Sequence, residues 1–174
     1  MSDNPVPMHT TTKRRLWIAA GYLLTALLLS VALLSDLVLG DALEDLRTFV
    51  AGAVATTLGF FGVPVTSHGS LISGPGSPLR IVNECTGLDA MILVVSAVVV
   101  LPASWHAKLV GIGLSILVLS VVNFIRVVTL VLVGSYFPEW LDVSHLYIWP
   151  VIVILAGIGV LSHWADRVES PRTA

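Results

Sequence analysis

Long apolar runs that carry almost no charge are the feature that most restricts how this chain folds. The clearest cover residues 16–34, 87–101, 109–134 and 146–161. The first is about 19 residues long, or about 28 Å as a helix, which is enough to cross the hydrocarbon core of a bilayer. Only 11% of all residues are charged, against about 25% in soluble domains. We therefore expect an all-α integral membrane protein with about four transmembrane helices.

The apolar runs predict a single membrane domain over residues 16–166. Residues 1–15 are polar and end in Lys13-Arg14-Arg15, which favours a disordered cytoplasmic tail followed by an uncleaved signal anchor. The apolar core of a cleaved signal peptide is shorter, at about 7–15 residues. Residues 167–174 are expected to form a second cytoplasmic tail.

The segment between the first two clear runs is harder to interpret. Residues 40–47 form an acidic break, and residues 48–63 are apolar but short. The latter either span the membrane as a thin helix or lie in its interface. Residues 65–82 are rich in turn formers and have apolar residues on both sides of Ser73-Gly74-Pro75-Gly76-Ser77, which predicts a small extracytoplasmic hairpin.

The distribution of basic residues predicts the orientation. If residues 48–63 do not cross, two basic residues lie outside, Arg47 and Arg80, and six are cytoplasmic: Lys13, Arg14, Arg15, Lys108, Arg167 and Arg172. If they do cross, the split becomes four and four. The positive-inside rule favours the first arrangement. It puts three tryptophans at the inner boundary and two at the outer: Trp17, Trp105 and Trp164, then Trp140 and Trp149.

The chain has one cysteine, Cys85, at the outer end of the second clear run. A lone cysteine more often serves as a small buried apolar residue than as a nucleophile, so its neighbours decide the interpretation. Thr86 and Asp89 are spaced as a capping box, which would start a helix just after the thiol and favour the thiolate. Glu84 and Asp89 oppose the thiolate by their charge, so Arg126 would have to compensate.

Arg126 is the strongest single signal, because an arginine inside an apolar helix usually faces the protein or a wet cavity. It lies about 27 Å along a helix from Lys108, and therefore near the outer boundary with Cys85 and His145. Snorkelling to the outer headgroups is the alternative, but Asn123, one turn earlier, has no such explanation. The polar residues of this helix recur every three positions, as Ser120, Asn123, Arg126 and Thr129.

These three groups suit acyl transfer. Arg126 would stabilise the thiolate or the oxyanion formed on attack, and His145 would act as base and then as acid. Asp142 either orients the His145 ring or caps the helix, and we favour the cap. The five histidines are scattered over both predicted sides of the membrane, so we expect no metal site and no cofactor. The net charge of −2 argues against a nucleic-acid partner.

These residues resemble the exosortase/archaeosortase family of membrane cysteine transpeptidases. The resemblance covers roughly residues 80–165 and includes Glu84-Cys85-Thr86-Gly87 heading one helix, Asn123-x-x-Arg126 in the next and His145 heading the last. The wider context is similar to the small exosortase H branch: Pro102-Ala103-Ser104-Trp105, Tyr136-Phe137-Pro138-Glu139-Trp140 and His145-Leu146-Tyr147. Thr86 stands where many members have Ser, and the chain is shorter than the eight-span members.

The resemblance implies a multi-pass protein of the bacterial cytoplasmic (inner) membrane with its active site on the extracytoplasmic face. Its partners would be exported proteins with a C-terminal motif (IPTL-type), an apolar helix and a basic end, and an acceptor nucleophile. Cys85 would be the nucleophile, Arg126 the stabiliser and His145 the acid and base, supported by Asn123, Glu84, Thr86 and Asp142.

Two other functions fit the sequence less well. A non-catalytic membrane chaperone or assembly factor would bind apolar C-terminal tails in the same pocket, with Arg126 gripping a carboxylate and Cys85 incidental. A thiol oxidoreductase is disfavoured, because that chemistry uses a cysteine pair and this sequence has one cysteine.

Overall fold

The computed structural model describes residues 8–34, 36–76 and 78–169. Its helices are α1 (Met8–Leu34), α2 (Asp36–Phe60), α3 (Leu88–Val100), α4 (Trp105–Tyr136), α5 (Leu141–Val143) and α6 (Trp149–Glu169). Three short strands, β1 (Thr66–His68), β2 (Leu71–Ser73) and β3 (Leu79–Arg80), form an antiparallel sheet in the order β1-β2-β3. The fold is thus mostly helical, as predicted.

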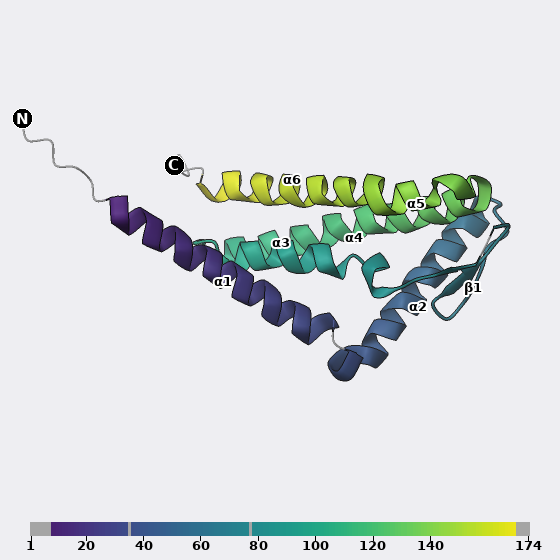
Figure 1. Cartoon of the computed structure of the whole chain (residues 1–174), viewed down its shortest axis with the longest axis horizontal. Coiled ribbons are helices and arrows are strands. Elements are labelled where there is room, and N and C mark those ends of the chain that lie inside the picture. The colour runs from purple at the N-terminus through teal and green to yellow at the C-terminus, as the bar shows by residue number, and fades with distance from the viewer. Residues whose placement is uncertain (1–7, 35, 77, 170–174) are drawn as a thin grey trace, which may run out of the picture.

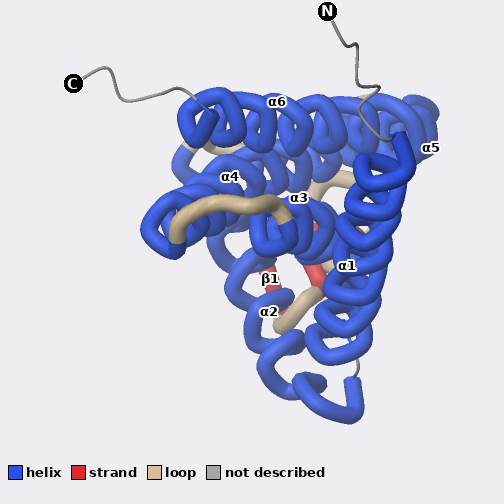
Figure 2. Tube along the Cα trace, turned by 90° about the vertical axis from the view of Figure 1, so that its left-hand side faces the viewer, coloured by secondary structure: helices blue, strands red, loops and turns tan. Residues whose placement is uncertain are grey.

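The helices form a bundle, and the three-stranded sheet lies at one end of it (Figure 1). Figure 1 shows α3, α4 and α6 running alongside one another, while α1 and α2 meet at an angle below them. In Figure 2, α1 lies along the edge of the bundle, where it packs against α3. The sheet lies against α2, beside the end of α4 that leads into α5 (Figure 1). Cys85 lies between β3 and α3 in the chain, and therefore where the sheet joins the bundle.

Two helices in the described part of the chain are long and apolar enough to cross a bilayer: Trp105–Tyr136, and the continuous helix Pro138–Val168 that contains α5 and α6. The other two predicted spans correspond to shorter apolar stretches, Trp17–Ala32 and Leu88–Val100. α2 meets neither description, because its first half carries several charged residues. The arrangement with four spans remains a prediction.

Several helices begin earlier than predicted. α1 starts at Met8, so residues 8–15, expected as a disordered tail, are helical. Residues 40–47, expected as a break, form part of α2 after a kink at Leu39 (φ −132°, ψ 21°). Charged residues such as Lys, Arg and Glu are good helix formers, so polarity alone was a poor guide to where a helix stops. α6 runs to Glu169, and residues 1–7 and 170–174 of the predicted tails lie outside the described residues.

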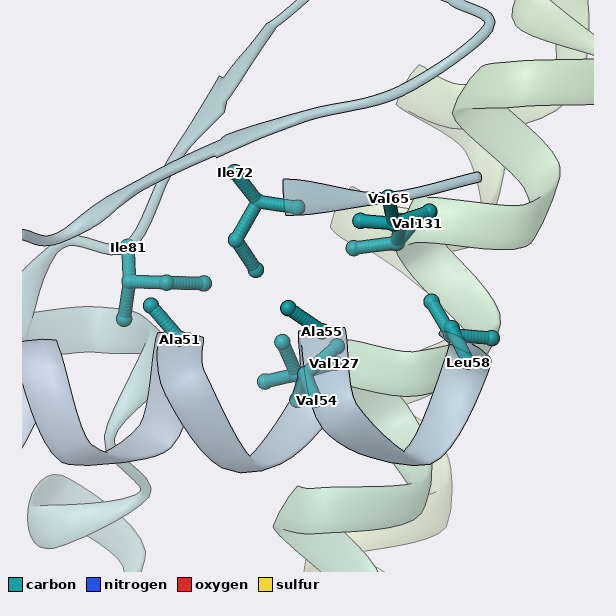
Figure 3. Close-up of a cluster of buried hydrophobic side chains, with 9 residues drawn as sticks. All are labelled: Ala51, Val54, Ala55, Leu58, Val65, Ile72, Ile81, Val127 and Val131. Atoms are coloured by element: carbon teal, nitrogen blue, oxygen red, sulfur yellow. The ribbon is translucent and has the colours of Figure 1, made fainter. Parts of the chain in front are cut away.

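The predicted hairpin is present as β2 and β3, with Ile72 paired to Leu79 across the Gly/Pro-rich turn. The extra strand β1 was not predicted, because three residues carry too little pattern. One face of α2 packs against this sheet and against α4 (Figure 3). The buried cluster is Ala51, Val54, Ala55, Leu58, Val65, Ile72, Ile81, Val127 and Val131, and Cys85 is partly buried against it.

Local sequence explains the start of α4. Leu101 is extended (ψ 140°), because a residue before proline avoids helical geometry, and so α3 stops ahead of Pro102. The Ser104 hydroxyl then caps α4 by accepting from the Ala107 amide at 3.3 Å. Trp164 is buried, and its indole N–H donates to the Ala107 carbonyl at 2.7 Å; its predicted place at the inner boundary stays a prediction.

Candidate active site

Cys85 ends a short 3₁₀ turn, Asn83–Cys85, just before α3. The Cys85 amide donates to the Val82 carbonyl at 2.9 Å. The Thr86 amide (2.9 Å) and hydroxyl (2.6 Å) both donate to the Asn83 carbonyl, which closes the turn. We call residues 83–86 the cysteine turn.

The predicted capping box is wrong. Gly87, in the left-handed conformation (φ +77°), is the residue that caps α3, with no side-chain capping bond. The Thr86 hydroxyl donates back to the turn instead, and it accepts only a long 3.5 Å contact from the Leu88 amide. The positive φ of Gly87 turns the chain between Thr86 and the helix, so the hydroxyl lies one residue too early to cap it.

Asn123 of α4 contacts the cysteine turn at the backbone of Cys85. Its side-chain amide donates to the Cys85 carbonyl at 2.7 Å, and the residue is 4% exposed. A carbonyl only accepts, so this bond fixes which end of the amide faces the turn. The Asn123 Oδ1 atom is buried without a hydrogen-bond partner. Gly87 permits this approach, because a Cβ there would lie 2.8 Å from Asn123 Cγ.

Arg126, one turn further along α4, also contacts the cysteine turn. Its Nη1 donates to the Glu84 carbonyl at 3.2 Å, while the Glu84 side chain is exposed. Its Nε is buried without an acceptor, and Asp89 lies close enough to interact with its charge. The guanidinium therefore faces the chain segment that carries the thiol, and one of its donors is unused.

Only part of the polar stripe predicted on α4 contacts the cysteine turn. Ser120 is exposed, and the Thr129 hydroxyl bonds back to carbonyls of its own helix at 2.9 Å. Asn123 and Arg126 are the two members that reach the cysteine turn.

His145 lies in a π-helical turn, Ser144–Ile148, and not at the start of a helix as predicted. The Trp149 amide donates to the Ser144 carbonyl five residues earlier, and Pro150 next to it has no amide hydrogen to donate. Such π turns recur at functional sites. The helix begins earlier, around Pro138, because Pro138–Trp140 already forms a 3₁₀ turn that leads into α5.

Cys85 and His145 line the same cavity, of about 160 Å³. Asp142 lines it too, and it does not cap a helix as predicted, since it is the second residue of α5, which begins without a side-chain cap. Arg80 of β3 adds a cation, and the remaining walls are apolar: Leu79, Ile81, Val82, Val127, Leu130, Val131 and Leu141. Cys85 and His145 thus border one mostly apolar space, and Arg126 is not among the residues that line it.

Arg47 is a residue of this region that sequence reasoning missed. It lies in α2, and its Nη1 donates to the Asn83 side-chain oxygen at 2.9 Å. Because the sequence predicts an acidic break over residues 40–47, it does not place Arg47 on a helix face. The helical spacing of Leu43, Arg47, Ala51, Val54 and Leu58 would have placed it on the face of α2 that is buried.

Comparison with known proteins identifies the family of this chain. Residues 9–147 match the family model of the transmembrane exosortases (Exosortase_EpsH). The chain is also 32% identical over 130 residues to archaeosortase A of Natronomonas pharaonis, which covers 74% of this chain and 37% of that protein. No solved structure matches. The chain belongs to the exosortase/archaeosortase family, which confirms the resemblance, and it spans little more than a third of the curated relative.

Proposed function

We propose that this protein is a membrane cysteine transpeptidase that cleaves the C-terminal sorting tails of exported proteins. Membership of the family and the apolar helices support a membrane protein of this class. The observation that carries the proposal is that Cys85 and His145 line one cavity, while Arg126 is bonded to the carbonyl just before Cys85.

In the first half of the reaction, His145 takes the proton of the Cys85 thiol, and the resulting thiolate attacks the carbonyl carbon of the scissile peptide bond. The negative charge moves to the carbonyl oxygen, where a donor from Arg126 stabilises it. Its Nε is buried with no acceptor in the protein, so this donor is free to bond the carbonyl oxygen of the substrate. The C–N bond then breaks, His145 gives its proton to the leaving amine, and a thioester to Cys85 remains.

In the second half, an acceptor nucleophile attacks the thioester. His145 takes the proton of the acceptor, the C–S bond breaks, and the Cys85 thiolate is restored. The acceptor is an amine, a hydroxyl or water. The apolar walls of the cavity limit water around the thioester, which favours transfer over hydrolysis.

The substrate would be an exported protein with a short motif of the IPTL type, an apolar helix and a basic end. The apolar helix would enter the bilayer beside the enzyme, and the basic end would stay in the cytoplasm. That arrangement presents the motif at the outer surface of the bacterial inner membrane, where the proposed topology puts the cysteine turn.

The test is co-expression with a secreted reporter that carries such a tail, followed by mass measurement of its new C-terminus. Cys85→Ala should leave the reporter unprocessed. The matched control is Ser162→Ala, which removes a hydroxyl on an exposed face of α6 that only bonds its own helix, and it should process normally. Normal processing by Cys85→Ala would exclude thiol chemistry and leave a tail-binding role.

A further inference from the structure

The side chain of Arg47 is held at both ends of its guanidinium. Its Nη1 donates to Asn83 Oδ1 at 2.9 Å, and its Nη2 pairs with the Glu44 carboxylate, one turn earlier on α2, at 2.9 Å. The side chain is 19% exposed, and its Nε is buried. An arginine that only reached outward to lipid headgroups would present its guanidinium to the surface.

Asn83 connects Arg47 to the turn that carries the thiol. The Asn83 carbonyl accepts both the amide and the hydroxyl of Thr86, so this one residue ties the two ends of the cysteine turn together. Its side chain ties the same turn to α2 through Arg47.

The cysteine turn is therefore fixed from two sides. α4 holds the carbonyls of Glu84 and Cys85 through Arg126 and Asn123. α2 holds the start of the turn through Arg47. These two helices also pack against each other through the buried cluster, which includes Ala51 and Val127 (Figure 3). A turn of four residues has few bonds of its own, so its orientation depends on these outside contacts.

We propose that Arg47 is a positioning residue of the site: through Asn83 it holds the cysteine turn so that the Cys85 sulfur faces the cavity it shares with His145. This inference rests on the proposed function, because it assigns a role within that reaction. Arg47 itself need not touch the substrate. Losing its contact should lower the rate of the chemical step more than it weakens tail binding.

The experiment is a double-mutant cycle with Arg47→Ala, Asn83→Ala and the double variant, each in the full chain. We expect each single change to lower kcat for tail cleavage by about 10- to 100-fold, as small misplacements of a reacting group do, with KM within about twofold. The double variant should be no worse than Arg47→Ala alone, because both changes break the same hydrogen bond and Arg47→Ala also removes the Glu44 ion pair. Losses that multiply, or wild-type kcat in Asn83→Ala, would overturn the proposal.

Asn83→Ala also separates geometry from charge, because it keeps the Arg47 cation and removes only its partner. If Arg47→Ala fails to fold, Asn83→Ala still breaks the same bond from the other side. The matched control is Arg167→Ala, which removes an exposed arginine from the last turn of α6, and it should cleave at the wild-type rate.

A second measurement does not depend on tail cleavage. Cys85 is the chain's one cysteine, so the rate of its alkylation by iodoacetamide across a pH series reports on that thiol alone. Arg47→Ala and Asn83→Ala should shift this profile in the same way, and Arg167→Ala should not. If the wild type cleaves no tail, the proposed function fails while the alkylation series still decides the role of Arg47. Unchanged alkylation in both variants would overturn the positioning role.

Discussion

The side-chain amide of Asn123 donates a 2.7 Å hydrogen bond to the backbone carbonyl of Cys85, 38 positions earlier in the chain. This bond joins the middle of α4 to the residue that carries the thiol. Since Arg126 lies one turn away on the same helix and bonds the Glu84 carbonyl, α4 sets the place of the thiol and of the guanidinium together. A change at either contact should therefore act on the relation between the two groups.

Asn123→Asp tests that contact with almost no change of shape. A carboxylate has no hydrogen to donate, so it would face the Cys85 carbonyl with like partial charges and leave that carbonyl unpaired. We expect tail cleavage to fall by about 100-fold and the free energy of unfolding to fall by about 1–3 kcal/mol. Cleavage kinetics and thermal unfolding in detergent would measure both. Turnover near the wild-type rate would mean that this bond does not position the thiol.

Arg126→Lys keeps the positive charge and removes the planar fork of donors. Arg126 uses one nitrogen on the Glu84 carbonyl and has another donor, Nε, unpaired beside the turn. Lysine has one nitrogen for both tasks, so we expect this variant to lose most of its turnover. The single-turnover rate of tail cleavage would measure it. A rate equal to the wild type would show that charge alone matters at this position.

Much of the site follows from the sequence because the fixed rise of a helix converts residue spacing into position across the membrane. The distance from Lys108 to Arg126 is fixed by the rise of the helix, and Asn123 one turn away reinforced the inference that this face meets protein. Both side chains do contact the cysteine turn. Their catalytic or supporting roles remain predictions.

The sequence did not reveal details that depend on backbone contacts between distant segments. Gly87, not the Thr86 and Asp89 pair, starts α3, because α4 approaches too closely for a side chain there. The partner of Arg47 depends in the same way on a distant segment, because its side chain bonds Asn83, 36 positions later in the chain. Acidic residues around Arg47 indicated a loop, yet the apolar face of α2 extends through them.

The predicted orientation has a direct test with a reporter that is active only outside the cytoplasm. Glu139 lies in the 3₁₀ turn between α4 and α5, and Ser104 caps the opposite end of α4. One crossing by α4 puts these two positions on opposite sides, so a fusion near Glu139 should be active and one near Ser104 silent. The reverse pattern would put the cysteine turn on the cytoplasmic side and contradict the proposed function.

Gly87→Ala should damage the site without removing any functional group. The residue has φ +77°, a conformation that costs an L-residue about 1–2 kcal/mol. The added methyl carbon would also lie 2.8 Å from Asn123 Cγ, so either α4 or the cysteine turn has to move. We expect a lower unfolding temperature and a fall in tail cleavage of about 100-fold, since the bond from Asn123 to Cys85 would be disturbed.

Gly113→Ala is the matched control for that change. Gly113 lies within α4, and an added Cβ there meets nothing within 4 Å. Alanine is the better helix former by about 1 kcal/mol, so this variant should unfold at the same or a higher temperature and cleave normally. Thermal unfolding and tail turnover measured on both variants separate a general cost of the extra methyl from its effect at the cysteine turn. Equal behaviour of the two variants would mean that the close approach of Gly87 and Asn123 is not needed to hold Cys85 in place.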